Sequence, residues 1–385
     1  MPTMLPARQF SALRLADVLT SSLEAVCARQ NPLGLPTVRK AVVILADGLG
    51  ASSIRARSGH ARFLSSRLNK SSIIDGVFPA TTAAGIATLT TGVEPGQHGL
   101  VGYQVLDGAR DRVVNQLTGW DGDMRPATWQ RERTVFERAA DESVPSFAIG
   151  PKRFVASGFT QAVLRGARYV AADTVADRFA AARSILSENP TALIYLYVAE
   201  LDVAAHAHGW QSDRWLAQLE TLDSEVSRFA STLRSDEGLL LTADHGVIDV
   251  PSTRHVLFDT EPALISGVRH VAGDPRCVQL YLEPQQTAGS ASSAADTLAD
   301  AWRESQGDRA WIYTRAEAVA AGLYGRVADE VLPRIGDVVI AARKSIAYYD
   351  SRPANQKARG MIGQHGSLTD EEVRVPLIRA GAFSR

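Results

Sequence analysis

Two Asp–His pairs in this chain have spacings that suit binding of a metal ion. Asp202 and His206 are four positions apart, so on a helix they lie on one face and both reach a single ion. Asp244 and His245 are adjacent, and Gly246 behind them lets the backbone bend so that both side chains enter one crevice. The chemistry that such residues support is metal-assisted displacement at an electrophilic centre.

Each pair also has a simpler interpretation. An Asp–His pair at helical spacing is often only a solvated surface, and His208 competes with His206 as the partner of Asp202. His208 stands six positions from Asp202, however, and points elsewhere on a helix, so we choose His206. For Asp244 and His245 the alternative is a strand-to-loop turn, which gives no reason for a histidine.

Two further segments carry residues with chemical potential. Asp47 begins an Asp-Gly pair that ends an apolar run, and by itself such a pair is typical of a turn. Residues 78–92 read as a helix after Pro79, with Thr81 and Thr82 in its first turn. A threonine there can serve as a simple N-cap. The same helix end can also stabilise an alkoxide and bind phosphate oxygens, and a metal ion touching the hydroxyl would lower its pKa.

The elements that would position these residues are predicted from apolar runs. Runs without polar alternation are typical of strands buried on both faces of a parallel sheet. The chain has three such runs, at residues 41–46, 191–198 and 238–243. Helical patterns lie at residues 172–187 and 214–233. Sheets of this kind bind ligands beyond the carboxyl ends of their strands, and Asp47 and Asp244 directly follow two of the runs.

A change in character along the chain predicts its domain organisation. We expect an α/β fold with a mostly parallel central sheet sandwiched by helices and an inserted, smaller α+β lid domain. The predicted parts are an N-terminal helical extension at 1–37, a catalytic core at 38–251 and 361–385, and the lid at 252–360. Within them we expect a helix at 15–28, an edge strand at 277–282, and strands at 337–342 and 373–378.

The composition is that of an ordinary globular protein. Of 385 residues, 45% are hydrophobic and 22% charged, with a net charge of −1 and both signs mixed, which predicts no stable nucleic-acid partner. Cys27 and Cys277 lack the spacing of a thiolate zinc site. Charged residues interrupt the N-terminal segment, and no stretch reaches the ~20 apolar residues that span a bilayer. We therefore expect a cytoplasmic protein without a membrane partner.

Taken in order, the motifs resemble those of the alkaline phosphatase superfamily, and most of all its nucleotide pyrophosphatase/phosphodiesterase branch. The shared order is Asp-Gly after a first strand, threonine at a helix start, Thr-Gly, His-Gly, Asp-x3-His, Asp-His-Gly and a late His-Gly. The resemblance covers residues 40–250 and 360–380, whereas the lid matches nothing specific.

The resemblance implies two metal sites, with zinc as the expected ion and manganese or iron as alternatives. One site would consist of Asp202, His206 and His365, and the other of Asp47, Asp244, His245 and the nucleophile oxygen. The family nucleophile stands ten residues before the glycine of the Thr-Gly pair. Counting back from Gly92 gives Thr82, with Thr81 as the alternative, while His98 matches a motif position without a ligand role.

Two departures from the family pattern concern the phosphoryl group. Family phosphodiesterases have Phe-Pro-Asn just after the nucleophile, whereas here Phe78 and Pro79 precede it. They also carry an asparagine that donates to a phosphoryl oxygen, where this chain has Tyr103. Either the phenol of Tyr103 makes that hydrogen bond, or Tyr103 packs and the helix N-terminus takes over.

The activity that the resemblance implies is two-metal hydrolysis of a phosphodiester or pyrophosphate bond in a small-molecule phosphate ester, such as a nucleotide derivative, through a phosphothreonine intermediate. Monoesterases of the superfamily place a cation at the third phosphoryl oxygen. Lys152 and Arg153 could reach it, although a solvated loop is the simpler interpretation, so we favour a diester or anhydride. The alternatives are a phosphomonoesterase or phosphonate hydrolase on the same ligands, a phosphotransferase or mutase, and an inactive binding module.

Overall fold

The central element of the fold is a six-stranded sheet. The computed structural model describes residues 13–284 and 291–384, so residues 1–12 of the predicted N-terminal extension, residues 285–290 of the predicted lid and Arg385 lie outside the described residues. The strand order is β18-β8-β1-β7-β5-β6. The strands are β1 (Lys40–Ala46), β5 (Ser146–Gly150), β6 (Arg168–Ala171), β7 (Ala192–Val198), β8 (Glu237–Thr242) and β18 (Ile378–Gly381).

The three apolar runs form the middle of this sheet. Strand β1 pairs in parallel with β7 on one side and with β8 on the other. Every residue of β1 and β8 is buried, because helices cover both faces of the sheet. Strands β5 and β6 continue the parallel arrangement beyond β7. The predicted α/β architecture with a mostly parallel central sheet is confirmed.

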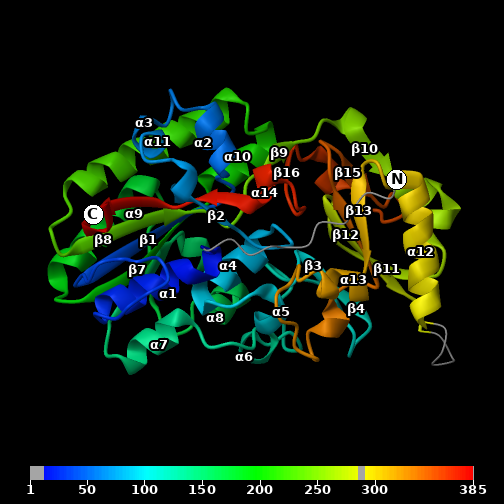
Figure 1. The fold of residues 1–385 in the computed structure, drawn as a ribbon, viewed down its shortest axis with the longest axis horizontal. Coiled ribbons are helices and arrows are strands. Elements are labelled where there is room, and N and C mark those ends of the chain that lie inside the picture. Colours follow the sequence, from blue (N-terminus) through cyan, green and yellow to red (C-terminus); the bar gives the residue numbers. More distant parts are fainter. Residues whose placement is uncertain (1–12, 285–290, 385) are drawn as a thin grey trace.

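Figure 1 shows the two helical layers that enclose the sheet. One layer contains α1 (Leu15–Val26), α4 (Thr82–Thr91), α7 (Val135–Asp141) and α8 (Gly158–Val163). The other contains α2 (Ala51–Ala56), α9 (Val175–Glu188), α10 (Glu200–His208) and α11 (Asp213–Ser231). Leu15, Val18 and Leu19 of α1 are buried in the same core as β1, so this helix packs directly on the central sheet.

A second sheet, with four antiparallel strands in the order β11-β12-β14-β13, lies in the other half of the molecule against helix α12 (Figure 1). Its strands are β11 (Val268–Asp274), β12 (Cys277–Leu282), β13 (Ala310–Thr314) and β14 (Val338–Ala342). The helices of this half are α12 (Ala291–Gln306) and α13 (Arg315–Ala320). The predicted edge position of 277–282 is wrong, because β12 pairs with β11 and with β14. Gln279, a polar residue unusual in an inner strand, is buried with its side chain bonded to Val101 and Gly336.

The C-terminal segment forms two strands, of which the second joins the central sheet. The single strand predicted at 373–378 is divided into β17 (Arg374–Pro376), which pairs with β2 (Ile73–Asp75), and β18, which pairs antiparallel with β8. Pro376 is still in register with Ile73 at the end of β17, and the chain then passes to β8. The antiparallel β18 makes the central sheet mixed at that edge.

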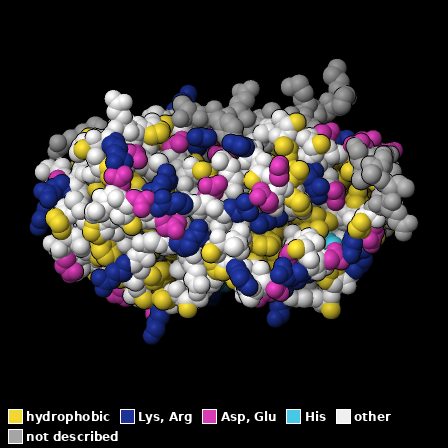
Figure 2. All heavy atoms as spheres, turned by 90° about the horizontal axis from the view of Figure 1, so that it is seen from below, with side chains coloured by type: hydrophobic (Ala, Val, Ile, Leu, Met, Phe, Trp, Pro, Cys, Tyr) yellow, Lys and Arg dark blue, Asp and Glu magenta, His cyan; other side chains and the backbone are white. Residues whose placement is uncertain are grey.

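The remaining helices and strands are short. They are α3 (Arg62–Ser65), α5 (Pro95–His98), β3 (Gln104–Asp107), β4 (Arg112–Asn115), α6 (Pro126–Trp129), β9 (Ile248–Asp249), β10 (His255–Leu257), β15 (Ala347–Tyr349), β16 (Gly363–Gln364) and α14 (Asp370–Val373). Acidic and basic side chains are interspersed over the face shown in Figure 2. Within the described part of the chain, helices long and apolar enough for a membrane crossing are absent.

Candidate metal centre

The carboxyl edge of the central sheet gathers the residues that the sequence singles out. Asp47 directly follows β1, and Asp244 and His245 follow β8 after one intervening residue. Helix α10 begins one residue beyond the end of β7 and presents Asp202 and His206 on adjacent turns. Because the carboxyl ends of parallel strands meet at one edge, three segments that are distant in sequence converge here.

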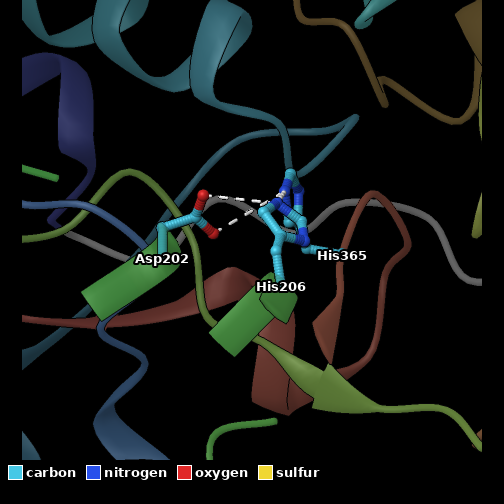
Figure 3. A group of neighbouring side chains, drawn as sticks. All are labelled: Asp202, His206 and His365. Carbon is cyan, nitrogen blue, oxygen red and sulfur yellow. Dashed lines mark hydrogen bonds and ion pairs between the residues drawn. The ribbon is translucent and has the colours of Figure 1, made fainter. Parts of the chain in front are cut away.

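Asp202, His206 and His365 form a first group, in which the side chains point toward one another (Figure 3). Nε2 of His206 lies 3.2 Å from Oδ2 of Asp202. Nε2 of His365, from the loop after β16, lies 3.9 Å from Oδ1 of Asp202. Each residue offers one ligand atom, and these atoms all lie within 4.8 Å of one another.

Backbone carbonyls fix the orientation of both imidazoles in the first group. Nδ1 of His206 lies 2.7 Å from the carbonyl of Gly363, and Nδ1 of His365 lies 2.8 Å from the carbonyl of Ala80. Since a carbonyl only accepts, each Nδ1 carries the proton and each Nε2 is directed into the group. The two Nε2 atoms are 3.3 Å apart, so they share a position that a proton or a metal ion can hold.

Asp47, Asp244 and His245 form a second group, and all three are buried. Nε2 of His245 lies 3.4 Å from Oδ1 of Asp47 and 3.6 Å from Oδ2 of Asp244. The hydroxyl of Tyr197 donates to Oδ2 of Asp47 at 2.5 Å, and the backbone N–H of Gly48 donates to Oδ1 of Asp244 at 3.2 Å. These outer hydrogen bonds leave one oxygen of each carboxylate directed at His245.

The two threonines at the start of α4 have different environments. The hydroxyl of Thr81, the N-cap residue, accepts a hydrogen bond from the backbone N–H of Ala84 at 3.4 Å. The hydroxyl of Thr82 instead lies 3.2 Å from Nε2 of His245, at the second group. Thr82 is the first residue of the helix, where backbone N–H groups have no intrahelical acceptor. Those free donors and the positive helix end favour binding of an anion beside the Thr82 hydroxyl.

Burial and mutual repulsion make the second group costly without a cation. Oδ1 of Asp47, Oδ1 of Asp202 and Oδ2 of Asp244 are buried without a hydrogen-bond partner among the described residues. Burial raises the pKa of Asp47 well above its usual value, and the charges of Asp244 and Asp202 raise it further. Burial also raises the pKa of Asp244. Unpartnered carboxylate oxygens facing imidazole nitrogens are a donor set that suits divalent cations.

In the first group, attraction between opposite charges outweighs the cost of burying the carboxylate. Burial opposes ionisation of Asp202, but the charge of His206 and its hydrogen bond outweigh burial, so the pKa of Asp202 is lowered. Burial, and then the charge of His245, holds the pKa of His365 well below its usual value. His365 is therefore a neutral imidazole, which is the form that binds metal ions.

Close packing brings the two groups and the helix together. The rings of His245 and His365, one from each group, stack with centroids 3.7 Å apart. A Cβ at Gly85 of α4 would lie 2.5 Å from Cβ of Asp244, so only glycine allows the helix to approach the second group. The six predicted ligands, drawn from segments spread over most of the chain, thus converge at one edge of the sheet beside Thr82.

A cavity of about 470 Å³ opens beside Thr82. Its walls are mainly apolar and aromatic and include Leu117, Trp120, Phe154, Phe159, Tyr169 and Tyr197. The sequence did not identify these residues, because aromatic side chains in apolar strands and short helices have the pattern of core residues. The position of Tyr197, at the end of a strand five residues before Asp202, is the signal that could have identified it.

The other residues considered in the sequence lie as follows. Arg153 lines the cavity beside Thr82, with its guanidinium 4.8 Å from the ring centroid of Phe154, whereas Lys152 is exposed. Tyr103 lines a separate cavity of about 600 Å³, so a hydrogen bond from its phenol to a phosphoryl oxygen stays a prediction. His208 bonds to Arg214 instead of joining a group.

His98 is buried and away from both groups. Its Nδ1 accepts from the backbone N–H of Leu100 at 3.1 Å, and its Nε2 lies 2.9 Å from the Thr88 hydroxyl. Burial, and then the charge of Arg334, lowers the pKa of His98 to about 3. A neutral, fully bonded imidazole in this position supports packing beneath α4.

Comparisons with known proteins agree with this geometry. Residues 41–368 match the model of the type I phosphodiesterase / nucleotide pyrophosphatase family. A search of curated protein sequences found no match.

Solved structures with the same fold include murine ectonucleotide pyrophosphatase/phosphodiesterase 5, at a TM-score of 0.65 and 15% identity over 89% of this chain and 88% of that chain. The human counterpart matches at a TM-score of 0.65 and 14% identity over the same shares of the two chains. An inactive threonine-to-alanine variant of the murine protein, in complex with AMP, matches at a TM-score of 0.66 and 15% identity, again with 89% and 88% coverage.

Proposed function

We propose that this chain, which belongs to the type I phosphodiesterase / nucleotide pyrophosphatase family, hydrolyses a phosphodiester or phosphoanhydride bond of a nucleotide derivative with two divalent metal ions and a threonine nucleophile. The observation that carries the proposal is the convergence of two Asp/His groups beside an apolar cavity, with the Thr82 hydroxyl 3.2 Å from His245 of the second group. The first group would hold one ion and the second group the other. Zinc is the ion we propose, because imidazole nitrogens and carboxylate oxygens are among its usual protein ligands.

Thr82 is the proposed nucleophile. Its hydroxyl faces the second group, while the hydroxyl of Thr81 is used as a helix cap. The inactive threonine-to-alanine variant of the murine relative supports a threonine in this role, and the AMP bound to that variant supports a nucleotide substrate.

The reaction follows in two displacements. Bound divalent cations would lower the pKa of the Thr82 hydroxyl and offset the negative charge on the phosphoryl and departing oxygens. Thr82 Oγ1 attacks phosphorus in line, a P–O bond to Thr82 forms, and the P–O bond to the departing group breaks. The hydroxyl proton of Thr82 ends on the departing oxygen. Water then attacks the phosphothreonine, which releases the phosphate monoester and returns a proton to Thr82.

The start of α4 and the adjoining cavity bind the substrate around that centre. The backbone N–H groups of Thr82 and Ala83, free of intrahelical acceptors, donate to a phosphoryl oxygen. The apolar cavity takes the group that stays esterified to phosphorus, and its aromatic walls suit a nucleobase. A monoester would have no such retained group, so the cavity favours a diester or anhydride.

The experiment that tests this proposal combines a metal count with a substrate panel. The panel consists of p-nitrophenyl phosphate, bis-p-nitrophenyl phosphate and thymidine 5′-p-nitrophenyl phosphate. We expect two divalent ions per chain and the highest kcat/KM for the thymidine diester. Thr82→Ala is expected to abolish turnover while retaining both ions.

Thr81→Ala is the matched control, because it removes a neighbouring hydroxyl that only caps the helix. We expect it to cost about 1 kcal/mol of stability and to keep most of the activity. Activity retained in Thr82→Ala and lost in Thr81→Ala would move the nucleophile by one residue. A chain that binds no divalent ion, or that prefers the monoester, would overturn the proposal.

A further inference from the structure

A second cavity, of about 600 Å³, lies beside the four-stranded sheet, and part of its wall belongs to strand β11. Asp274 at the end of β11 and Tyr349 of β15 form part of its wall. The hydroxyl of Tyr349 accepts from the side-chain amide of Gln364 at 3.1 Å, directly before His365. A Cβ at Gly366, directly after His365, would lie 3.1 Å from Cβ of Asp274. The wall of this cavity therefore packs against the loop that carries a predicted metal ligand.

Asp274 is a carboxylate that lacks its full set of partners. Its side chain is nine-tenths buried, with 9% of its surface exposed. The backbone N–H of Tyr103 donates to it, but Oδ2 has no hydrogen-bond partner among the described residues. Burial raises the pKa of Asp274 to about 7. A buried, incompletely bonded carboxylate is unfavourable unless a hydrogen-bond donor or cation meets it.

The cationic side chains of the same cavity already have anionic partners. Arg269 and His270 both pair with Asp111, His270 at 2.8 Å. Arg352 pairs with Asp350 at 2.7 Å. An anionic departing group such as pyrophosphate thus meets paired cations here. A cationic group meets Asp274, whose Oδ2 lacks a hydrogen-bond partner in the described part of the chain and whose charged neighbours include His206 and Glu372. Charge complementarity therefore favours a cation.

Aromatic residues on the walls add to this preference. Tyr103, Phe258 and Tyr349 line the cavity together with Asp274. Ring faces attract ammonium groups through the negative potential above the ring. The cavity beside Thr82 is apolar by comparison, with Arg153 as its charged lining residue. The two cavities therefore suit groups of different chemistry.

We propose that this second cavity binds the departing group of the substrate and that Asp274 pairs there with a positively charged amine on that group. The inference rests on the proposed function and deepens it, because in-line attack by Thr82 sends the departing oxygen away from the threonine and toward the first group. The substrate class is a phosphodiester that joins a nucleoside to an amino alcohol. Attack breaks the P–O bond to the amino alcohol, which leaves with the proton from Thr82 and with its ammonium group beside Asp274.

Matched substrates test this assignment. Thymidine 5′-phosphate diesters of 4-(aminomethyl)phenol, 4-(hydroxymethyl)phenol and 4-methylphenol differ only in the group that would meet Asp274. The metal-loaded full chain is assayed with each substrate, and the release of thymidine monophosphate is measured by chromatography. The measured quantity is the ratio of kcat/KM for the ammonium substrate to that for the methyl substrate. Differences in intrinsic reactivity cancel when the wild-type ratio is compared with that of Asp274→Asn.

We expect Asp274→Asn to lower this ratio by at least about tenfold, as for loss of a buried charge pair, with the methyl substrate changed by no more than about twofold. The hydroxymethyl substrate should give an intermediate ratio. Asp141→Asn is the control, because it removes an exposed carboxylate that does not line this cavity. This control is expected to keep the wild-type ratio within about twofold.

The possible outcomes separate this inference from the proposed function. An unchanged ratio in Asp274→Asn would overturn the amine assignment. Equal losses on all three substrates together with reduced metal content would also overturn it, because they would mean that Asp274 only supports the metal ligands. If Asp274→Asn folds poorly, the inhibition constants of 4-(aminomethyl)phenol and 4-methylphenol are compared on the wild-type protein. Stronger inhibition by the amine supports the inference, and equal inhibition overturns it. Absence of wild-type turnover on every substrate would contradict the proposed function itself.

Discussion

The hydroxyl of Tyr197 donates a hydrogen bond of 2.5 Å to Oδ2 of Asp47 and thereby joins the apolar cavity to the second group. Oδ1 of the same carboxylate faces Nε2 of His245 at 3.4 Å. Burial raises the pKa of Asp47, and the bond from Tyr197 acts in the opposite direction. Tyr197 therefore favours the ionised carboxylate, which is the form that binds a cation.

Tyr197→Phe is expected to weaken metal binding without removing a ligand. The variant keeps the ring that lines the cavity and loses only the donor to Asp47. Loss of such an outer hydrogen bond costs about 10–100-fold in metal affinity, measured by competition with a chromophoric chelator. Tyr195→Phe, two residues earlier on the same strand and lining the same cavity, is the control and should retain wild-type affinity. Equal affinity in the two variants would mean that the Asp47 bond has no influence on the ion.

Removal of metal should reverse the effect of Asp47→Asn on stability. In the metal-free protein, burial holds the pKa of Asp47 above its unfolded value of 3.8. The folded state then binds more protons than the unfolded state between these two pKa values, so stability falls as the pH rises through that range. At pH 8 without metal, we expect Asp47→Asn to be more stable than wild type by about 1–3 kcal/mol.

With metal bound, the order should be the opposite, because the variant loses a ligand and the stabilisation that binding supplies. Urea unfolding of both proteins with and without EDTA measures the crossover. The same order of stability in both conditions would show that the carboxylate is not directed at a cation.

Much of this arrangement could be predicted from sequence because its signals are local. Three apolar runs predicted strands β1, β7 and β8, and the ends of β1 and β8 determine where Asp47 and Asp244 lie. The antiparallel pairing of β18 and the inner position of β12 could not be predicted, because they depend on contacts between residues far apart in the sequence.

Residues that act through tertiary contacts were also missed. Phe159 and Tyr197 have the hydrophobic pattern of core positions, and only the folded chain shows that they line a cavity. Asp274 resembles an ordinary turn residue in an Asp-Pro pair, and its burial becomes visible only when β11 packs beside Gly366.

Phe159→Ala should impair substrates that place a base in the apolar cavity. Stacking of a base on an aromatic side chain contributes about 1–3 kcal/mol, so kcat/KM for thymidine 5′-p-nitrophenyl phosphate should fall about tenfold. Methyl p-nitrophenyl phosphate has no base and should change by no more than about twofold. Phe63→Ala, a phenylalanine outside the cavity that contacts Arg67, is the control. Equal losses on both substrates would place the base elsewhere.

The fully buried ion pair between Arg276 and Glu372 connects the four-stranded sheet to the loops of the metal centre. Their side chains approach to 2.7 Å, and Arg276 also donates to the carbonyls of Lys344 and Ile346. The backbone carbonyl of Glu372 accepts from Gly246, directly after His245. Its carboxylate also accepts from the backbone N–H of Ser367, two residues after His365. Glu372 thus contacts the loops after both histidines, one through its backbone carbonyl and the other through its carboxylate.

Arg276→Met is expected to lower the free energy of unfolding by about 3–5 kcal/mol, because it leaves the Glu372 carboxylate buried without its counter-ion. The double variant Arg276→Met/Glu372→Gln removes that uncompensated charge and should recover part of the loss. Urea unfolding of the metal-loaded proteins measures both values. An exposed ion pair such as Arg133–Asp141 provides the comparison, and Arg133→Met should change stability by less than about 1 kcal/mol. If Arg276→Met were as mild as Arg133→Met, the buried pair would not be what secures these loops.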